Sequence, residues 1–284
     1  MEYIDEGFIR EKIFRRDRAS HKGNFGKVLV FAGSLGMAGA AQFAGKGALL
    51  AGAGLVRFLL PSLGSALCPV LQISVPEATC VGYKAGMDLS EYNVCVAGCG
   101  LGTSPQAKAI LTYIIENFKG TLVLDADALN IIAADKEKRV FAPADIILTP
   151  HVGEARRLLK PAEYKMNDEK SRMDAARALA EKYNAVAVLK GAGTLVAWKN
   201  TDVYKNTTGN PGMATGGSGD VLAGIIGGLA AQGYSPEDAA RIGVFVHGKA
   251  GDIAAEKFGE MSLTAGDIIK YLPEALKLYY PEGL

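Results

Sequence analysis

Short, continuous hydrophobic runs recur along the chain and alternate with longer, helix-like segments. The runs have strand length and cover residues 28–32, 55–60, 94–97, 121–125, 145–149 and 186–190. A run that is apolar at every position suits a strand buried on both faces, as in parallel sheets. Most of the helix-like segments, at about ten to fifteen residues, match the spacing of βαβ units. We therefore expect an α/β fold with a central, mostly parallel sheet covered by helices on both faces.

Local signals place several helix starts and one hairpin. Ser104 and Ser235 each precede a proline, which combines an N-cap with a first-turn proline. Thr264 with Asp267 resembles a capping box. Residues 194–206 read as two short strands around a polar turn, which predicts an antiparallel hairpin at one sheet edge.

Composition and charge narrow the functional classes. The 31 basic side chains nearly cancel the 30 acidic ones, so we expect no binding to nucleic acid or to a membrane surface. The longest apolar run, residues 221–231, is too short for a membrane span, which needs about 20 residues. The acidic start of the chain is unlike a secretory signal and predicts a cytoplasmic protein. Because we find no linker or repeat, we expect residues 1–284 to form a single domain.

The cysteines and His247 are interpreted as structural, whereas the glycine clusters indicate tight turns or ligand contacts. The cysteines at positions 68, 80, 95 and 99 form no C-x-x-C pair and lack clustered histidines, so we interpret them as reduced, mostly buried thiols rather than metal ligands. His247 and Asp252, among small residues of a helix-like segment, are interpreted as structural. The 35 glycines gather in short clusters, as expected where a backbone turns tightly or approaches a ligand.

The most informative cluster is a polar, glycine-rich loop at residues 206–220, which passes abruptly into the apolar run. Free amides and the positive dipole end of a helix form a ready anion site. The residues expected to form this anion hole are Gly216, Gly217, Ser218 and Gly219. Asp220 would lie beside a transferring phosphoryl group, ionised by the helix dipole and able to accept the proton of an attacking hydroxyl.

A plain helix cap is the alternative for this cluster, because aspartate and glycine are common at helix starts. Three glycines in four positions favour a functional loop, since a cap needs only one suitable residue. The chain has neither a G-x-G-x-x-G nor a G-x-x-x-x-G-K-[ST] sequence, which argues against ordinary Rossmann and P-loop enzymes.

Further motifs follow the apolar runs, at the strand ends where open α/β sheets bind ligands. The glycines of residues 33–41 fit a tight turn or a substrate contact. The carboxylates of residues 124–130 would help to hold magnesium-bridged phosphates or fix sugar hydroxyls, or else lie in a solvated turn. His151 is interpreted as a site residue rather than as a packed histidine or a helix cap. Lys190 is either a nucleotide contact or a surface charge.

Together these motifs resemble the ADP/ATP-dependent NAD(P)H-hydrate dehydratase family, whose members share the ribokinase-like fold. The most specific is N-P-G-M-A-T-G-G-S-G-D at residues 210–220. One departure is Met37-Ala-Gly-Ala40, where many relatives have proline second. The other matching segments, spread over nearly the whole chain, are residues 21–23, 33–34, 100–102, 125–130, 148–154 and 190–194.

The resemblance implies a function and a set of site residues. The substrate would be the S epimer of hydrated NADH or NADPH, which is dehydrated with ADP or ATP and Mg²⁺, releasing AMP or ADP and phosphate. Asp220 would be the catalytic base. Positions that match hydrate contacts are Ala40, Gly102, His151 and Asp220. Positions that match contacts with the adenine nucleotide are Lys190, Gly191, Ala192, Gly193, Thr194 and Gly219.

The resemblance also implies partners, while the residues leave rival functions open. Relatives commonly form tetramers, so we expect a homotetramer, to which the Gly/Ala-rich helical segments would lend themselves. An epimerase domain that the family often carries would be a separate chain here. A small-alcohol kinase of the same fold is the main rival, and a nucleotide-binding regulator is disfavoured by the intact Asp220 and its glycines. The sequence identifies no metal ligands and does not separate ADP from ATP.

Overall fold

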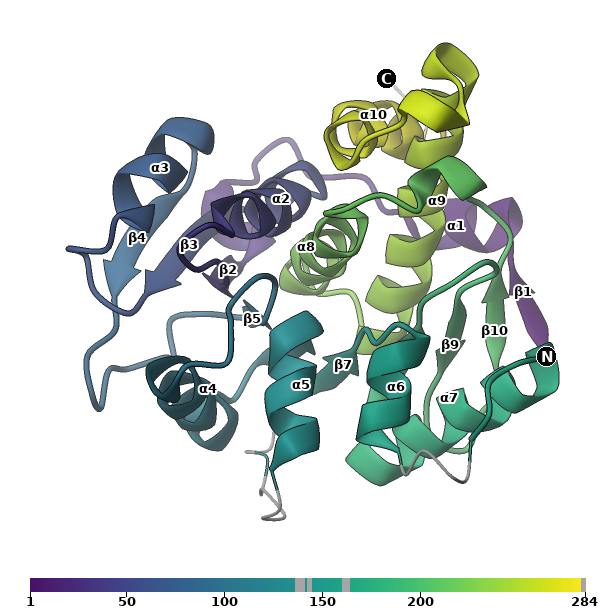
Figure 1. Cartoon of the computed structure of the whole chain (residues 1–284). Coiled ribbons are helices and arrows are strands. Elements are labelled where there is room, and N and C mark those ends of the chain that lie inside the picture. The colour runs from purple at the N-terminus through teal and green to yellow at the C-terminus, as the bar shows by residue number, and fades with distance from the viewer. Residues whose placement is uncertain (136–140, 142–144, 160–163, 282–284) are drawn as a thin grey trace.

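A ten-stranded sheet runs through the computed structural model, which describes residues 1–135, 141, 145–159 and 164–281 (Figure 1). The strand order is β1-β10-β9-β8-β7-β6-β5-β2-β3-β4, and β9 alone runs antiparallel to its neighbours. The strands are β1 (Glu2–Ile4), β2 (Lys27–Phe31), β3 (Leu55–Leu60), β4 (Thr79–Gly82), β5 (Val94–Ala97), β6 (Thr121–Leu124), β7 (Ile146–Leu148), β8 (Val186–Leu189), β9 (Leu195–Ala197) and β10 (Tyr204–Asn206).

The expected α/β class and mostly parallel sheet are confirmed, and all six apolar runs form strands. The hairpin of β9 and β10 is also confirmed. Its predicted place at the sheet edge is wrong, because β1 pairs in parallel with the outer side of β10. Neither β1 nor the other edge strand, β4, was expected. Strand β1 has three residues, of which only Ile4 is buried, so its sequence shows no alternation of apolar and polar positions.

Helices cover both faces of the sheet, and the cap signals are confirmed. Ser104 accepts a hydrogen bond from the amide of Ala107, Ser235 accepts one from Asp238, and Thr264 forms a capping box with Asp267. The helices are α1 (Glu6–Lys12), α2 (Ala38–Leu50), α3 (Leu67–Ser74), α4 (Pro105–Asn117), α5 (Ala126–Ala134), α6 (Val152–Leu158), α7 (Glu169–Tyr183), α8 (Ser218–Ala231), α9 (Pro236–Phe258) and α10 (Ala265–Lys277), with 3₁₀ turns at Lys22–Phe25, Pro211–Met213 and Glu260–Ser262.

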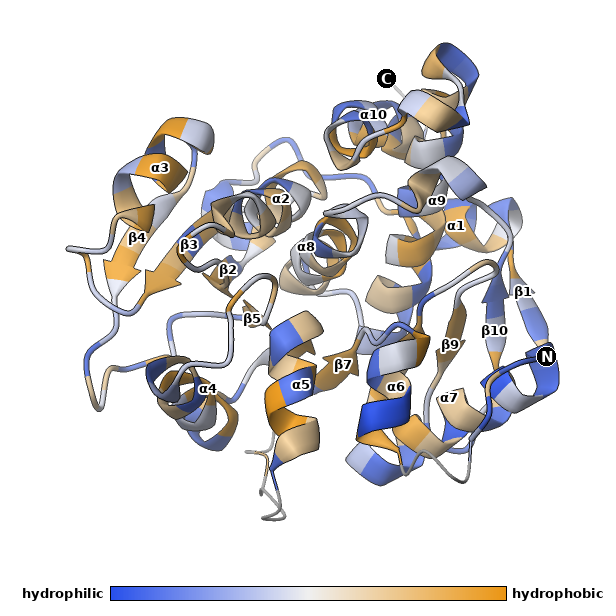
Figure 2. Ribbon diagram, in the orientation of Figure 1, coloured by the Kyte–Doolittle hydropathy of each residue, from blue (hydrophilic) through white to orange (hydrophobic). Residues whose placement is uncertain are grey.

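The sheet divides the buried apolar side chains into two clusters. One lies under α1, α2, α3, α8, α9 and α10, and the other under α4, α5, α6 and α7. Successive residues of β2 alternate between them, with Val28 and Val30 in the first and Leu29 and Phe31 in the second, as the period of two in a strand requires. Figure 2 shows inner strands such as β5 and β7 as hydrophobic, whereas β10 near the edge is largely hydrophilic.

In the described part of the chain, no helix is long and apolar enough to cross a membrane.

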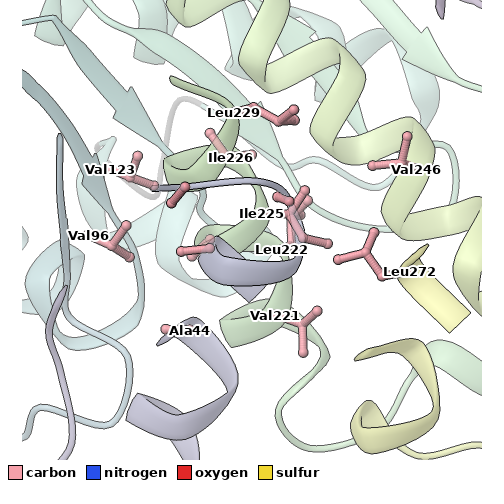
Figure 3. Close-up of a cluster of buried hydrophobic side chains, with 14 of the residues drawn as sticks. Ala44, Val96, Val123, Val221, Leu222, Ile225, Ile226, Leu229, Val246 and Leu272 are labelled. Carbon is pink, nitrogen blue, oxygen red and sulfur yellow. The ribbon is translucent and has the colours of Figure 1, made fainter. Parts of the chain in front are cut away.

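Helix α8 is the central helix of its layer and sets the position of the candidate site (Figure 1). Nearly all its residues are buried, and it packs on α2, α9 and the centre of the sheet (Figures 1 and 3). Glycine permits a very close approach of α8 to α2, because a Cβ on Gly224 would lie 2.1 Å from the carbonyl oxygen of Ala44. Gly228 faces Ala48 in the same way. These glycines therefore serve packing within the chain and are not available for contacts between subunits.

Candidate active site

The motifs that follow the strands meet at the carboxyl edge of the sheet. Backbone hydrogen bonds extend the ladder beyond the strand ends: Gly33 N donates to Cys99 O at 2.8 Å, and Asp125 N donates to Ala97 O at 3.0 Å. Lys190 N donates to Pro150 O at 2.8 Å. Five segments that are distant in sequence are thereby held side by side, at the edge where parallel sheets bind ligands.

The glycine-rich loop reaches this edge as the N-terminus of α8. Gly217 is the N-cap residue, with φ of +91°, and no side chain caps the helix. A Cβ on Gly217 would meet the ring of Phe43 at 2.6 Å, so glycine is required here by both backbone angle and space. The amide of Ser218 is 3.4 Å from Thr215 O, whereas those of Gly216, Gly217 and Gly219 have no acceptor among the described residues. The amides left open at the start of α8 are therefore those of the glycines.

The Asp220 side chain lies in the first turn of α8 and is largely buried. Burial, reinforced by the nearby Asp125 carboxylate, raises the pKa of Asp220 from its ordinary value to about 6, against the opposing effects of Cys99 and Lys190. Desolvation thus opposes the ionisation that the helix dipole was expected to favour, without abolishing it. At neutral pH the carboxylate is still mostly ionised, and its raised pKa makes it a stronger proton acceptor.

A buried ion pair lies against the backbone of this turn. Lys190 Nζ is 2.6 Å from Asp125 Oδ1, with side-chain exposures of 17% and 2%. Burial alone would lower the pKa of Lys190, but the carboxylates of Asp125 and Glu154 outweigh it, so that the pKa is raised. A Cβ on Gly219 would lie 3.1 Å from Lys190 Nζ. The solvated turn at Asp125 and the surface charge at Lys190 are both excluded by this burial.

Cys99 lies in one cluster with Asp125 and Asp220. The sequence did not predict its place there. Its Sγ is 3.8 Å from Asp125 Oδ2, and burial raises the pKa of the thiol well above its ordinary value. The interpretation of Cys99 as a buried thiol is right, but the thiol lies among charged groups. The available signal was its place between two glycines at the end of β5.

The segment of residues 190–194 forms an exposed turn beside the ion pair. Gly191 and Gly193 have φ of +150° and +58°, and Thr194 Oγ1 donates to Gly191 O at 3.0 Å. Arg172 of α7 donates through Nη1 to Ala192 O at 2.9 Å and through Nη2 to Gly193 O at 3.4 Å. Arg172 thus fixes the backbone of the turn at residues 190–194. The sequence offered no signal for this role.

Ala40 and Gly102 lie on the opposite side of α8 from this turn. Ala44 of α2 faces Gly224 of α8. One helical turn earlier in each helix, Ala40 therefore lies level with Asp220. A Cβ on Gly100 would lie 2.7 Å from the Ala40 side chain, which brings the loop after β5 against α2.

The backbone of Gly102 is held by a chain of side chains. Gly102 has φ of +74°, and its amide donates to Asp127 Oδ2 at 2.8 Å. Asn130 donates to the other carboxylate oxygen of Asp127 and accepts from Arg157 Nε at 2.9 Å. Asp127 is therefore engaged in positioning this loop rather than left in a solvated turn.

His151 caps a helix, the interpretation that the sequence had placed second. Its Nδ1 accepts from the amides of Gly153 and Glu154 at 2.9 and 3.4 Å, and Glu154 Oε2 accepts from the His151 amide at 2.8 Å. The imidazole of His151 remains 54% exposed. The backbone of His151 forms a parallel β-bridge with Lys190. The cap thus fixes the ring at the site edge with a face open to a ligand.

Two residues interpreted as structural hold the glycine-rich loop. His247 Nε2 lies 2.9 Å from Ser218 O, and burial lowers the pKa of His247 to about 4, so its neutral ring donates to this carbonyl. Asp252 accepts from the amide of Gly209 and from Asn210 Nδ2, both at 2.9 Å. The structural interpretation is right, and its consequence is to fix the loop that presents Asp220.

A metal ion is one occupant that the cluster around Asp220 suggests. Donor atoms of Cys99, Asp125 and Asp220 lie within 4.8 Å of one another. The set does not fit Mg²⁺, which takes oxygen ligands, because the third donor is a protonated thiol and Asp125 already pairs with Lys190. We therefore assign no protein ligand to magnesium.

Comparison with known proteins identifies relatives over most of the chain. The family model described as NAD(P)H-hydrate dehydratase matches residues 28–274. The chain is 40% identical to the ADP-dependent (S)-NAD(P)H-hydrate dehydratase of Neisseria meningitidis, covering 89% of this chain and 86% of that protein. It is 39% identical to the bifunctional NAD(P)H-hydrate repair enzyme of Moorella thermoacetica, covering 96% of this chain and 53% of that protein. The chain thus spans about half the length of the bifunctional curated relatives it matches.

Solved structures agree in fold. The ADP/ATP-dependent NAD(P)H-hydrate dehydratase of Bacillus subtilis, co-crystallised with ATP and Mg²⁺, is 30% identical with a TM-score of 0.86, covering 98% of both chains. A ribokinase-like superfamily protein of Enterococcus faecalis is 28% identical with a TM-score of 0.86, covering 99% of this chain and 96% of the other. The expected ribokinase-like fold is confirmed, and the chain belongs to the NAD(P)H-hydrate dehydratase family.

Proposed function

We propose that this chain dehydrates the S epimer of hydrated NADH and NADPH at the expense of ADP or ATP, as a metabolite-repair enzyme. The observation that carries the proposal is the position of Asp220. Its partly buried carboxylate, with a pKa raised to about 6, lies beside the glycine amides at the start of α8, which have no acceptor among the described residues. A proton acceptor next to an anion site is the arrangement that phosphoryl transfer to a hydroxyl requires.

The reaction begins at the hydroxyl of the reduced nicotinamide ring. Asp220 accepts the hydroxyl proton while the oxygen attacks the terminal phosphorus of the nucleotide, and the bond from that phosphorus to the bridging oxygen breaks. The glycine amides at Gly216, Gly217 and Gly219 stabilise the phosphoryl oxygens as charge develops. The lone pair of the ring nitrogen then expels phosphate by cleavage of the carbon–oxygen bond. Loss of a proton from the adjacent ring carbon restores the double bond.

The two substrates would meet at the Asp220 turn. We assign the adenine nucleotide to the Lys190–Thr194 turn and Gly219, because the ion pair of Lys190 joins these segments. The hydrate is assigned to Ala40, Gly102, His151 and Asp220. ADP is proposed as the donor from the Neisseria meningitidis relative, and ATP from the Bacillus subtilis structure. Mg²⁺ would arrive with the nucleotide phosphates.

The homotetramer, a separate epimerase partner and the cytoplasmic location stay predictions from sequence. The epimerase would matter to the proposed reaction, since an enzyme that accepts one epimer consumes only part of a mixed hydrate pool. An epimerase added to the assay is therefore expected to raise the final yield of NADH without changing the initial rate.

The test follows both products with purified protein, hydrated NADH and Mg²⁺, adding ADP, ATP or no nucleotide. We expect nucleotide-dependent recovery of the absorbance of the reduced nicotinamide, with one phosphate released for each NADH formed. A small-alcohol kinase would consume nucleotide on another substrate and release no phosphate. Nucleotide consumption without recovery of absorbance, or no reaction at all, would refute the proposal.

Replacing Arg172 with alanine is expected to weaken nucleotide binding. The guanidinium fixes the carbonyls of Ala192 and Gly193, and loss of these charged hydrogen bonds should raise the KM for nucleotide about tenfold, equivalent to about 1.4 kcal/mol. The kcat should change less, because Asp220 is untouched. Arg177→Ala is the matched control, since Arg177 on the same helix makes only an exposed ion pair with Asp174 at 3.7 Å. Equal effects of the two substitutions would contradict the assignment.

A further inference from the structure

Three side chains, those of Asp125, Cys99 and Lys190, lie around the Asp220 carboxylate. Asp125 and Cys99 bring donor atoms that, with those of Asp220, lie within 4.8 Å of one another. Asp125 is 1% exposed and Cys99 is fully buried, so little water screens their interactions. Lys190 Nζ lies 2.6 Å from Asp125 Oδ1, an ion pair that fixes this second carboxylate in place.

The titratable groups around Asp220 differ in the sign of their charge and in their distance from its carboxylate. Helices α2, α9 and α10 and strands β5 and β6 pack against α8. The titratable groups that act on Asp220 are Asp125, Cys99, Lys190 and Asp127, and Glu154 acts on Lys190. Helices α2, α9 and α10 also carry Lys46, His247 and Asp267. His247 is neutral because burial lowers its pKa to about 4, and Asp267 is engaged in the Thr264 capping box. The close interactions with Asp220 therefore come from Asp125, Cys99 and Lys190.

We propose that Asp125 and Cys99 are positioning residues that act on Asp220 in opposite directions, the carboxylate favouring its proton uptake and the thiol opposing it. This inference rests on the proposed function of Asp220 as the proton acceptor. Neither residue touches the substrate in this arrangement, and both act through the electrostatics of one carboxylate.

The two effects follow from elementary electrostatics. A negative charge beside a carboxylate disfavours its ionised form, so Asp125 raises the pKa of Asp220. The thiol of Cys99 donates to Asp125 Oδ2 at 3.8 Å and lies within 4.8 Å of a carboxylate oxygen of Asp220. A donor that turns toward Asp220 favours its ionised form, so the thiol lowers the pKa of Asp220. The neighbouring Lys190 also lowers it, but its charge is shared with Asp125. Removing Asp125 would therefore both delete the like charge and leave Lys190 free to stabilise the Asp220 carboxylate.

The test titrates Asp220 directly, by carbon NMR of protein labelled at the aspartate carboxyl carbons, with Asp220→Asn to assign the signal. Asp125→Asn is expected to move the Asp220 midpoint to lower pH by about one unit, the size expected for loss of a like charge within about 5 Å. Cys99→Ala is expected to move the midpoint to higher pH by less, because a thiol is a weak donor. The acid limb of kcat/KM should move in the same two directions.

Matched variants separate this role from a purely structural one. Cys99→Ser keeps a donor, and a stronger one, so the midpoint of Asp220 should stay at or below its wild-type value. Cys95→Ala removes another fully buried thiol, on β5 but in the cluster on the other face of the sheet, and should leave the midpoint unchanged. These cysteine variants decide the matter even if Asp125→Asn fails to fold because Lys190 loses its partner.

The outcomes distinguish the two proposals. Opposite shifts of the Asp220 midpoint in Asp125→Asn and Cys99→Ala support the inference, whether or not the protein turns over hydrated NADH. Opposite shifts without turnover would sink the proposed function alone. An unchanged midpoint in Cys99→Ala, or shifts of the same sign in both variants, would overturn the inference even in an active enzyme.

Discussion

Asp220→Asn is expected to lower kcat by about 10²–10⁴-fold, the usual contribution of a positioned general base. The amide keeps the shape of the side chain but cannot accept the proton of the attacking hydroxyl. The KM for nucleotide should change little, because the glycine amides and the Lys190–Thr194 turn remain. Initial rates at saturating nucleotide check this, with direct binding of the nucleotide as the control. A variant that retains more than a tenth of wild-type kcat would remove Asp220 from the mechanism.

The same substitution is expected to stabilise the fold at neutral pH. Because the pKa of Asp220 is raised to about 6 in the folded chain, the folded state holds its proton more tightly than the unfolded state, and this group costs stability as pH rises from about 4 to 6. Asparagine removes that cost, on the order of 1–3 kcal/mol above pH 6. Denaturant unfolding at pH 7 and pH 4 should show the advantage at pH 7 only.

Gly224→Ala is expected to cost about 3 kcal/mol or more of unfolding free energy, at the upper end for overpacking a core. Its Cβ would lie 2.1 Å from Ala44 O and 2.9 Å from Ala44 Cα, and a helix backbone cannot move aside as a flexible side chain can. Figure 3 shows Ala44 of α2 among the buried side chains of α8. Thermal unfolding should show a decrease in Tm of roughly 5–10 °C.

The same change should reduce activity, because Gly224 and Asp220 are one turn apart on the face of α8 toward α2. Gly39→Ala in α2 is the control, since a Cβ there meets no atom within 4 Å and alanine favours a helix. Its Tm should stay the same or rise slightly. If Gly224→Ala unfolds at the wild-type temperature, the contact between α2 and α8 is looser than the distances indicate.

The sequence predicted the parts of the fold that depend on local pattern. Most of the inner strands are buried on both faces, so they appear in the sequence as short, largely apolar runs. The edge strand β1 has only one buried residue, Ile4, and left no such run. Its pairing outside β10 comes from contacts about 200 residues apart, which local periodicity does not reveal.

The candidate site shows the same division. Asp220 and its glycines were predicted because a loop and a helix start are contiguous in sequence. The partners of Asp220 were not, because Asp125 and Lys190 are separated by 65 positions and meet only when the strand ends align. The raised pKa of Asp220 could not be predicted for a related reason, since burial is a property of packing and not of the helix start alone.

The most direct test of the central claim, that Asp220 activates the ring hydroxyl for phosphoryl transfer, follows the hydroxyl oxygen. NADH hydrated in H₂¹⁸O carries the label on this hydroxyl, and the reaction is run with ADP or ATP in ordinary water. Unreacted hydrate is recovered as a control for exchange of the label. The account predicts one ¹⁸O in each released phosphate, because phosphate leaves with the ring oxygen. Unlabelled phosphate, with the label retained in the recovered hydrate, would mean that water attacks the nucleotide and would contradict the account.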